Sequence, residues 1–138
     1  MPVSRVGEAV HLDMSGLLRR AMHRLFIFSA QARTKHKDGF VHITWRTDKE
    51  RRNIRKHGLD FSLAEQVFAN PLSETLPDRI VDGEERWHTI GATVLGGRFK
   101  IVVIVHTYPD PDDETWIHVI SLREATAHER RQYEVPRF

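Results

Sequence analysis

The sequence predicts an α+β domain in which one antiparallel sheet packs against a few short helices. Three observations lead to this prediction: several apolar runs of strand length, a Gly-Gly pair between two of them, and a capping pattern at three candidate helix starts. The length of 138 residues suits one core of modest size. We therefore expect about four strands, two helices after the first strand, one C-terminal helix and an added N-terminal helical segment.

The first 39 residues differ from the rest in charge. They carry seven Lys and Arg against three acidic residues, whereas the remaining 99 residues carry 14 basic and 16 acidic ones. Apolar residues recur there at roughly helical spacing among arginines, at Leu12, Leu17, Leu18, Met22, Leu25 and Phe26. This pattern predicts a basic amphipathic helix over about 13–29, or a partly disordered arm, that could bind a membrane surface or a partner or pack on the sheet. We place an extension at 1–39 and the main domain at 40–138.

The strands follow from alternation and from turn residues. Residues 41–45 alternate and form the first predicted strand, and a short strand near 72–75 is also compatible with the pattern. Residues 85–95 and 98–106 flank Gly96 and Gly97, which suit a tight hairpin turn with positive φ. Residues 116–122 form the last predicted strand. The continuous apolar run at 101–105 indicates a central strand that is covered on both faces.

The helices follow from capping patterns. A Ser or Thr three residues before a Glu marks candidate helix starts at 47–50, 62–65 and 126–129, which is the capping-box spacing. We therefore expect helices over about 48–57, 63–69 and 127–134. Gly58 can end the first helix in a left-handed conformation. Asn70 and Pro71 end the second, because proline cannot continue a helix.

Several classes of protein are disfavoured by composition. The chain has no cysteine, which excludes disulfides and thiolate metal sites and fits a cytoplasmic protein. No apolar stretch approaches the roughly 20 residues that span a bilayer. The nine histidines form no H-x-H or H-E-x-x-H pair, so we expect no metal site.

Several short motifs lie along residues 41–134. They include Trp45 with Asp48-Lys49, Asn53-Ile-Arg-Lys-His-Gly-Leu-Asp-Phe61, Gly83-Glu-Glu-Arg-Trp87, Ile120-Ser-Leu-Arg123 and Glu129-Arg-Arg-Gln-Tyr-Glu134. In order and spacing they resemble the BrnT family of toxins from type II toxin–antitoxin systems. Three features depart from the family pattern: the extension at 1–39, His118 where relatives often carry arginine, and Leu122 in place of the usual alanine.

This resemblance implies a RelE-like fold and an endoribonuclease that cleaves RNA without a cofactor, inhibits translation and arrests growth. It also implies a BrnA-type antitoxin with a ribbon-helix-helix DNA-binding domain. The two proteins would form a hetero-oligomer that contacts operator DNA through the antitoxin. An alternative function is a catalytically weak module that binds the antitoxin and acts mainly as a co-repressor of its own operon.

Metal-free RNA cleavage needs a proton acceptor for the 2′-hydroxyl, a proton donor for the leaving oxygen and cations near phosphorus. The catalytic candidates are His57, Lys56, Glu85, Arg86 and Arg123. His57 shares a helix face with Asn53 and Ile54. Ile54 is the only aliphatic residue of this helix, so we expect it to orient that face toward the sheet, with His57 either a core histidine or a site residue. Arg52 and Arg55 are candidate substrate-binding residues, although they and Lys56 also suit a solvated or antitoxin-facing surface. Arg123 can bind a phosphate or pair with Glu129 or Glu134.

The hairpin register adds three candidate substrate-binding residues: Trp87, Arg98 and His106. A turn on Gly96 and Gly97 pairs residue 95 with 98 and residue 87 with 106. The face with Glu85, Trp87 and His106 is more polar than the opposite one, so we expect it to meet RNA, with Trp87 stacking on a base. Ordinary packing of the tryptophan against the histidine is the alternative. Arg86 and Arg98 lie at opposite ends of the hairpin and on opposite faces.

Overall fold

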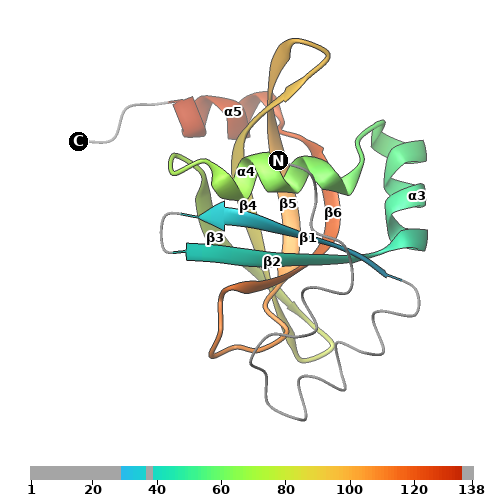
Figure 1. Cartoon of the computed structure of the whole chain (residues 1–138). Helices are drawn as coiled ribbons and strands as arrows, with labels where there is room; N and C mark the ends of the chain where they lie inside the picture. The colour runs from blue at the N-terminus through green and yellow to red at the C-terminus, as the bar shows by residue number, and fades with distance from the viewer. Residues whose placement is uncertain (1–28, 37–38, 135–138) are drawn as a thin grey trace.

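The chain forms one strongly twisted sheet with helices on both of its faces. The computed structural model describes residues 29–36 and 39–134 (Figure 1). The N-terminal half contains β1 Ser29–His36, β2 Gly39–Arg46, α3 Thr47–His57, the 3-10 turn η1 Phe61–Leu63 and α4 Ala64–Ala69. The C-terminal half contains β3 Glu74–Val81, β4 Glu84–Leu95, β5 Arg98–Thr107, β6 Trp116–Glu124 and α5 Ala127–Glu134. The predicted helix over 13–29 lies outside the described residues, except for Ser29, which begins β1.

The α+β class is confirmed, but the predicted sheet of about four antiparallel strands is wrong. The described residues form a six-stranded mixed sheet in the order β1-β2-β6-β5-β4-β3, in which β2 and β6 are parallel and the other neighbours antiparallel. A parallel pair needs a long connection, and here that connection is most of the chain between Arg46 and Trp116. β1 belongs to the sheet although it precedes the boundary that we predict at residue 40.

Two hairpins organise the C-terminal half of the sheet. The β4–β5 turn has positive φ at Gly96 and Gly97, and the predicted register is confirmed along the whole hairpin, with Trp87 opposite His106 and Leu95 opposite Arg98. The β3–β4 turn is built in the same way on Asp82 (φ 51°) and Gly83 (φ 78°). β3 is therefore longer than the short strand that we predict near 72–75.

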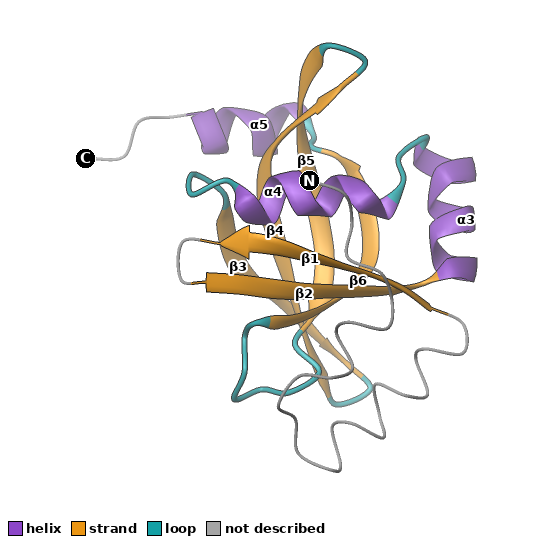
Figure 2. Cartoon of the chain, in the orientation of Figure 1, coloured by secondary structure: helices purple, strands orange, loops and turns teal. Residues whose placement is uncertain are grey.

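The main core lies on the face of the sheet that α3, η1 and α4 cover. It contains buried apolar residues from β2, β5, β6, η1 and α4, among them Ile43, Phe61, Val67, Ile104 and Leu122. A smaller cluster, Ile90 and Val103 with Ala125 and Tyr133, lies on the opposite face against α5. Figure 2 shows α4 crossing in front of the strands and α3 standing beside β6. Within the described residues, no helix is long and apolar enough to cross a membrane.

The helix ends follow local chemistry only in part. Gly58 ends α3 with φ 71° and donates to the Ile54 carbonyl, as predicted. The capping box of α5 is confirmed, because the Thr126 and Glu129 side chains each accept from the other's backbone N–H. The other two boxes are wrong: Glu50 accepts from the Phe61 N–H, and Asp60 caps the turn that leads into α4.

Candidate functional site

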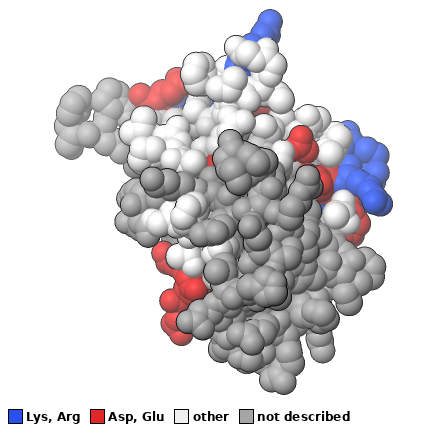
Figure 3. Space-filling view, viewed as in Figure 1, with Lys and Arg blue, Asp and Glu red and all other residues white. Residues whose placement is uncertain are grey.

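Cationic side chains gather on α3. Figure 3 shows this group as a blue patch on one side of the molecule. Its exposed members are Arg51, Arg52, Arg55 and Lys56. Arg52 lies 2.9 Å from Asp48, and the Arg46 guanidinium contacts the same carboxylate at 3.0 and 3.2 Å. Asp48 therefore offsets part of the charge near the start of the helix, while the cations of the last turn stay open to a partner.

Asn53 fixes α3 against the edge of β6. β2 ends at Arg46, so among the described strands none pairs with the later part of β6 on that side. The Asn53 amide replaces it: Nδ2 donates to the Leu122 carbonyl at 2.7 Å, and Oδ1 accepts from the Leu122 N–H at 3.0 Å. Nδ2 also donates to the Leu59 carbonyl at 2.9 Å. Our expectation that Ile54 orients this helix is wrong, because Ile54 is 45% exposed whereas Asn53 is buried.

His57 lies one helical turn after Asn53 and is partly exposed. His57 is therefore not a core histidine, and its role as a site residue stays a prediction. Burial lowers the pKa of His57, and the positive charges of Lys56 and Arg123 lower it further. The imidazole is therefore mostly neutral at pH 7, and it lies in the field of two cations.

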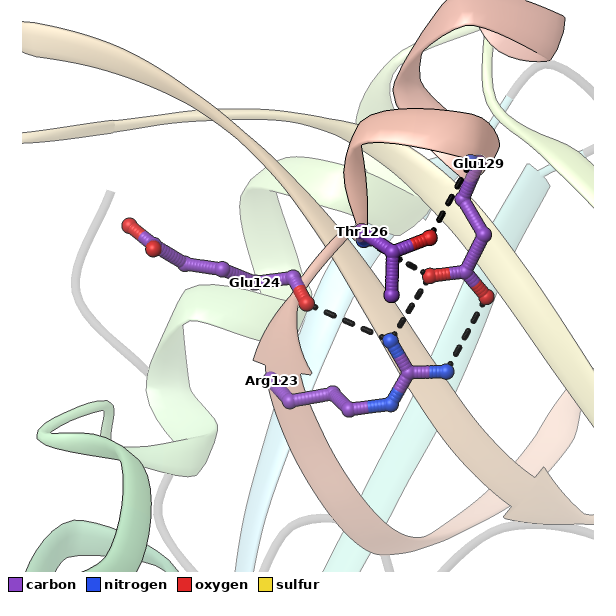
Figure 4. Close-up of polar contacts among 4 residues, drawn as sticks. All are labelled: Arg123, Glu124, Thr126 and Glu129. Carbon is purple, nitrogen blue, oxygen red and sulfur yellow. Dashed lines mark hydrogen bonds and ion pairs between the residues drawn. The ribbon is translucent and has the colours of Figure 1, made fainter.

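Arg123 emerges from β6 beside the start of α5 (Figure 4). Its two terminal nitrogens contact the Glu129 carboxylate at 2.8 and 3.0 Å, and one of them also donates to the Glu124 carbonyl at 3.2 Å. This contact lowers the pKa of Glu129 to about 2 and raises the pKa of Arg123. Of the alternatives for Arg123, pairing with Glu129 is the one that the structure shows.

A second polar group lies on the face of the sheet opposite α4. Its members come from four strands and are Thr44, Arg86, Thr107 and His118. Thr107 pairs with His118. The hairpin register in which Trp87 lies opposite His106, continued by one residue, places Arg86 opposite Thr107. His118 Nδ1 shares a hydrogen bond of 2.8 Å with Thr44 Oγ1. Burial lowers the pKa of His118 to about 4, helped by the charges of Arg46 and Lys49. Arg86 is partly exposed, and its Nε is buried with no hydrogen-bond partner among the described residues.

Sequence reasoning missed His118 as a member of this group, and it missed Arg46 and Lys49 near His118. The alternation along the first and last strands places Thr44 and His118 on matching sides of their strands. The parallel pairing that brings the two strands together has no local signal.

The prediction that His106 meets RNA is wrong in this fold. Its ring is fully buried and packs edge-on against both Phe68 and Tyr108, with 5.2 Å between ring centroids in each case. His106 Nε2 shares a hydrogen bond of 2.8 Å with Thr89, and burial lowers the pKa of His106 to about 3. The face that we predict to bind RNA is therefore the core face beneath α4.

The remaining candidates are spread out. Trp87 is partly buried, and its ring packs edge-on against Tyr108 with 5.6 Å between ring centroids. It therefore packs in the fold, but the ring that it contacts is this tyrosine and not the histidine of the packing alternative. Glu85 is exposed near the start of β4, and Arg98 is exposed at the far tip of the hairpin. The structure thus places His57 in the electric field of Lys56 and Arg123, and it does not add Glu85, Trp87, Arg98 or His106 to this group. Among the described residues, no three His, Asp or Glu side chains converge as metal ligands.

Comparison with known proteins identifies the family. Among curated proteins, none matches this chain significantly. The family model described as "Ribonuclease toxin, BrnT, of type II toxin-antitoxin system" matches residues 45–129, more than half of the chain, from the end of β2 into α5. The matched segment contains the cationic helix, His57, Arg86, His118 and Arg123. The chain therefore belongs to the BrnT family of ribonuclease toxins from type II toxin–antitoxin systems.

Proposed function

We propose that this protein is a metal-independent endoribonuclease that cleaves RNA in the cytoplasm and thereby inhibits translation and growth. Family membership supports the class of activity. The observation that carries the site is the position of His57, which is partly exposed at the end of α3, where Asn53 binds that helix to the end of β6. Burial lowers the pKa of His57, and the nearby charges of Lys56 and Arg123 lower it further. His, Lys and Arg side chains can supply every proton transfer and charge contact that this chemistry needs.

In the proposed reaction, neutral His57 accepts the proton of a 2′-hydroxyl as that oxygen attacks the adjacent phosphorus. The bond from phosphorus to the 5′-oxygen breaks, and the Lys56 ammonium donates a proton to that leaving oxygen. The products are a 2′,3′-cyclic phosphate and a 5′-hydroxyl. Arg123 stabilises the negative charge that builds on the phosphoryl oxygens.

The partly exposed members of the group on the face opposite α4, Arg86 and His118, would bind RNA beyond the cleavage point. Neighbouring strands lie about 4.8 Å apart, so Arg86 and His118, two strands apart, are separated by roughly 10 Å along the sheet. That spacing, with Arg46 and Lys49 near His118, suits contacts to successive phosphates of one strand. Arg52 and Arg55 extend the positive surface along α3.

The antitoxin is the expected protein partner, because membership of a type II system implies one. We propose a BrnA-type antitoxin with a ribbon-helix-helix domain, which would neutralise the toxin in a hetero-oligomer and carry it to operator DNA. The α+β architecture is compatible with the RelE-like fold that the resemblance implies.

The test is cleavage of a labelled RNA by the purified chain in EDTA, with His57→Gln as the key variant. His128→Gln is the matched control, because His128 is an exposed histidine on α5. We expect His57→Gln to slow cleavage by about 10²–10⁴, the usual range for loss of a general base, and His128→Gln to leave it unchanged. Circular dichroism checks that both variants fold. Equal rates for the folded His57→Gln variant and the parent would remove His57 from the mechanism.

One observation favours the alternative, a catalytically weak module that binds the antitoxin and enhances repression. Glu129 occupies both terminal nitrogens of Arg123, so an RNA phosphate must compete with a bidentate carboxylate. The same assay separates the two functions. Intact RNA after prolonged incubation with the folded chain, together with tight antitoxin binding, is the outcome that this alternative predicts.

A further inference from the structure

A cavity of about 360 Å³ opens on the core side of the sheet, away from the cationic helix. It lies between the end of α4, the start of β2 and the loop that joins β5 to β6. Its volume is at the lower end of the range for ligand pockets. The proposed ribonuclease mechanism uses none of the residues that line it.

The walls of the cavity are aromatic and held in place. Phe68 and Tyr108 both line it, and both pack edge-on against the buried ring of His106 behind them. Thr75 and Thr89 share a hydrogen bond of 2.7 Å, and Thr89 shares one with His106. The cavity is therefore preformed, because its walls are fixed by contacts with the core.

The mouth of the cavity is acidic. Glu114 lines it, is exposed, and makes no ion pair or hydrogen bond with any residue in the described ranges. The loop that contains Glu114 also carries Asp110, Asp112 and Asp113, with no Lys or Arg between Thr107 and Trp116. In Figure 3 an acidic group lies at the lower left, where Figure 1 places this loop. Burial raises the pKa of Tyr108 to about 12, and the negative charge of Glu114 raises it further.

We propose that this cavity is a docking site for an arginine or lysine side chain on a segment of a partner protein. The aliphatic stem would lie between Phe68 and Tyr108, the cation would face the aromatic ring of Tyr108, and the charged end would pair with Glu114. RNA does not fit this chemistry, because the acidic loop repels a polyanion. The antitoxin of the proposed function is the partner that would present such a segment, and only this identification rests on that function.

The experiment titrates the full-length chain with a blocked peptide, acetyl-Ala-Arg-Ala-amide, and follows backbone amide NMR shifts. The matched probe replaces arginine with citrulline, which has nearly the same shape and no charge. We expect the arginine peptide to shift amides of residues 68–75 and 108–115, and the citrulline peptide to bind at least tenfold more weakly. Added salt should also weaken the binding of the arginine peptide.

Two variants locate the charge. Glu114→Gln should weaken binding of the arginine peptide at least tenfold. Glu134→Gln, which removes an exposed carboxylate from α5, should leave that binding unchanged. Glu114 is exposed on a loop, so the fold should survive its substitution. Equal binding of both peptides, or no effect of Glu114→Gln, would overturn the proposal.

A third titration uses a short 2′-O-methyl RNA, which cannot be cleaved through its 2′-oxygen. Shifts confined to α3 and β6 support the proposal. Shifts at residues 108–115 that disappear in Glu114→Gln would assign the cavity to RNA and overturn it. None of these titrations depends on cleavage. Their results can therefore contradict the proposed docking site without affecting the proposed ribonuclease activity, and the cleavage assay can contradict that activity without affecting the docking site.

Discussion

His57 combines two properties that a general base at neutral pH needs. Its ring is partly exposed, and its pKa is lowered by burial, by Lys56 and by Arg123. The neutral form is therefore available at pH 7, next to cations that can attract a phosphate. A histidine in a solvated helix end without such neighbours would hold a larger fraction of imidazolium.

The pH profile of cleavage should report this environment. We expect kcat/KM to rise with pH through a value below 6.5, the ordinary pKa of histidine, and to level off near neutrality. Lys56→Gln removes one cause of the lowered pKa, so the acidic limb should move upward, even though the maximal rate also falls. NMR titration of the His57 ring checks the same shift directly. A limb that stays in place in Lys56→Gln would show that another group controls it.

Glu129 has opposing effects on stability and on RNA binding. Glu129→Gln should weaken the α5 cap and the ion pair with Arg123, which lowers the free energy of unfolding by about 1–2 kcal/mol. The same change leaves Arg123 more available to a phosphate, so we expect RNA to bind several-fold more tightly. Filter binding of uncleavable RNA and urea unfolding measure the two effects, with Glu134→Gln as the control. Weaker RNA binding in Glu129→Gln would mean that Arg123 acts only through the position that Glu129 gives it.

At the scale of elements, α4 approaches β4 closely because residue 91 is a glycine. A Cβ at Gly91 would lie 2.1 Å from Ser73 Oγ and 2.9 Å from Val67 Cγ1. Gly91→Ala should therefore lower the free energy of unfolding by about 1–3 kcal/mol. Adding Ser73→Ala removes the nearest atom and should restore part of that loss. Thermal unfolding of both single variants and the double variant measures this coupling, and simple additivity would argue against the close contact.

The elements that sequence reasoning located are those with local signals. Gly58, Gly96 and Gly97 mark a helix end and a turn wherever the rest of the chain lies, and the hairpin register follows from the turn alone. The Asp82-Gly83 turn carries an equally strong hairpin signal, which would have extended β3 to its full length. The pairing of β2 with β6 has no such signal, because the two strands are joined by most of the domain.

The candidate site was only partly predictable for the same reason. Alternation shows that Trp87 and His106 share a face, but it does not show which face the helices cover. The helix pattern favoured Ile54 as the buried position, whereas the edge of β6 required a side chain with both a donor and an acceptor, which Asn53 provides. Both errors, on the face with Trp87 and His106 and on the buried position of α3, arise because elements distant in the sequence decide which side chains are buried.

For the whole molecule, one buried histidine, His106, and one partly buried histidine, His118, make stability depend on pH. The pKa of His106 is lowered to about 3 and that of His118 to about 4, whereas each is near 6.5 in the unfolded chain. Between these values the unfolded state binds more protons than the folded state. The free energy of unfolding should therefore be highest above about pH 6.5 and fall as the pH drops toward 4 and then 3. Each unit of pKa difference corresponds to about 1.4 kcal/mol.

Urea unfolding between pH 7 and pH 4 measures this dependence. His118→Gln should reduce the slope, because it removes one of the two imidazoles, and His128→Gln should not change it. A flat profile over that range would contradict the buried, neutral state of both rings.

The whole molecule also separates two kinds of surface. Lys56 and His57 end α3 near Arg123, where Asn53 binds this helix to β6. The acidic loop borders the cavity on the core side of the sheet. This separation predicts that RNA and a basic protein segment bind different faces. The toxin could then be held by its partner at a site distinct from the one that cleaves.

The most direct measurement is cleavage of a defined RNA by the purified full-length chain in EDTA, with the ends of the products identified by mass spectrometry. The proposed mechanism predicts 2′,3′-cyclic phosphate and 5′-hydroxyl ends, and loss of cleavage in His57→Gln but not in His128→Gln. Intact RNA from the folded parent protein, or 5′-phosphate ends that appear only when a divalent metal is added, would contradict it.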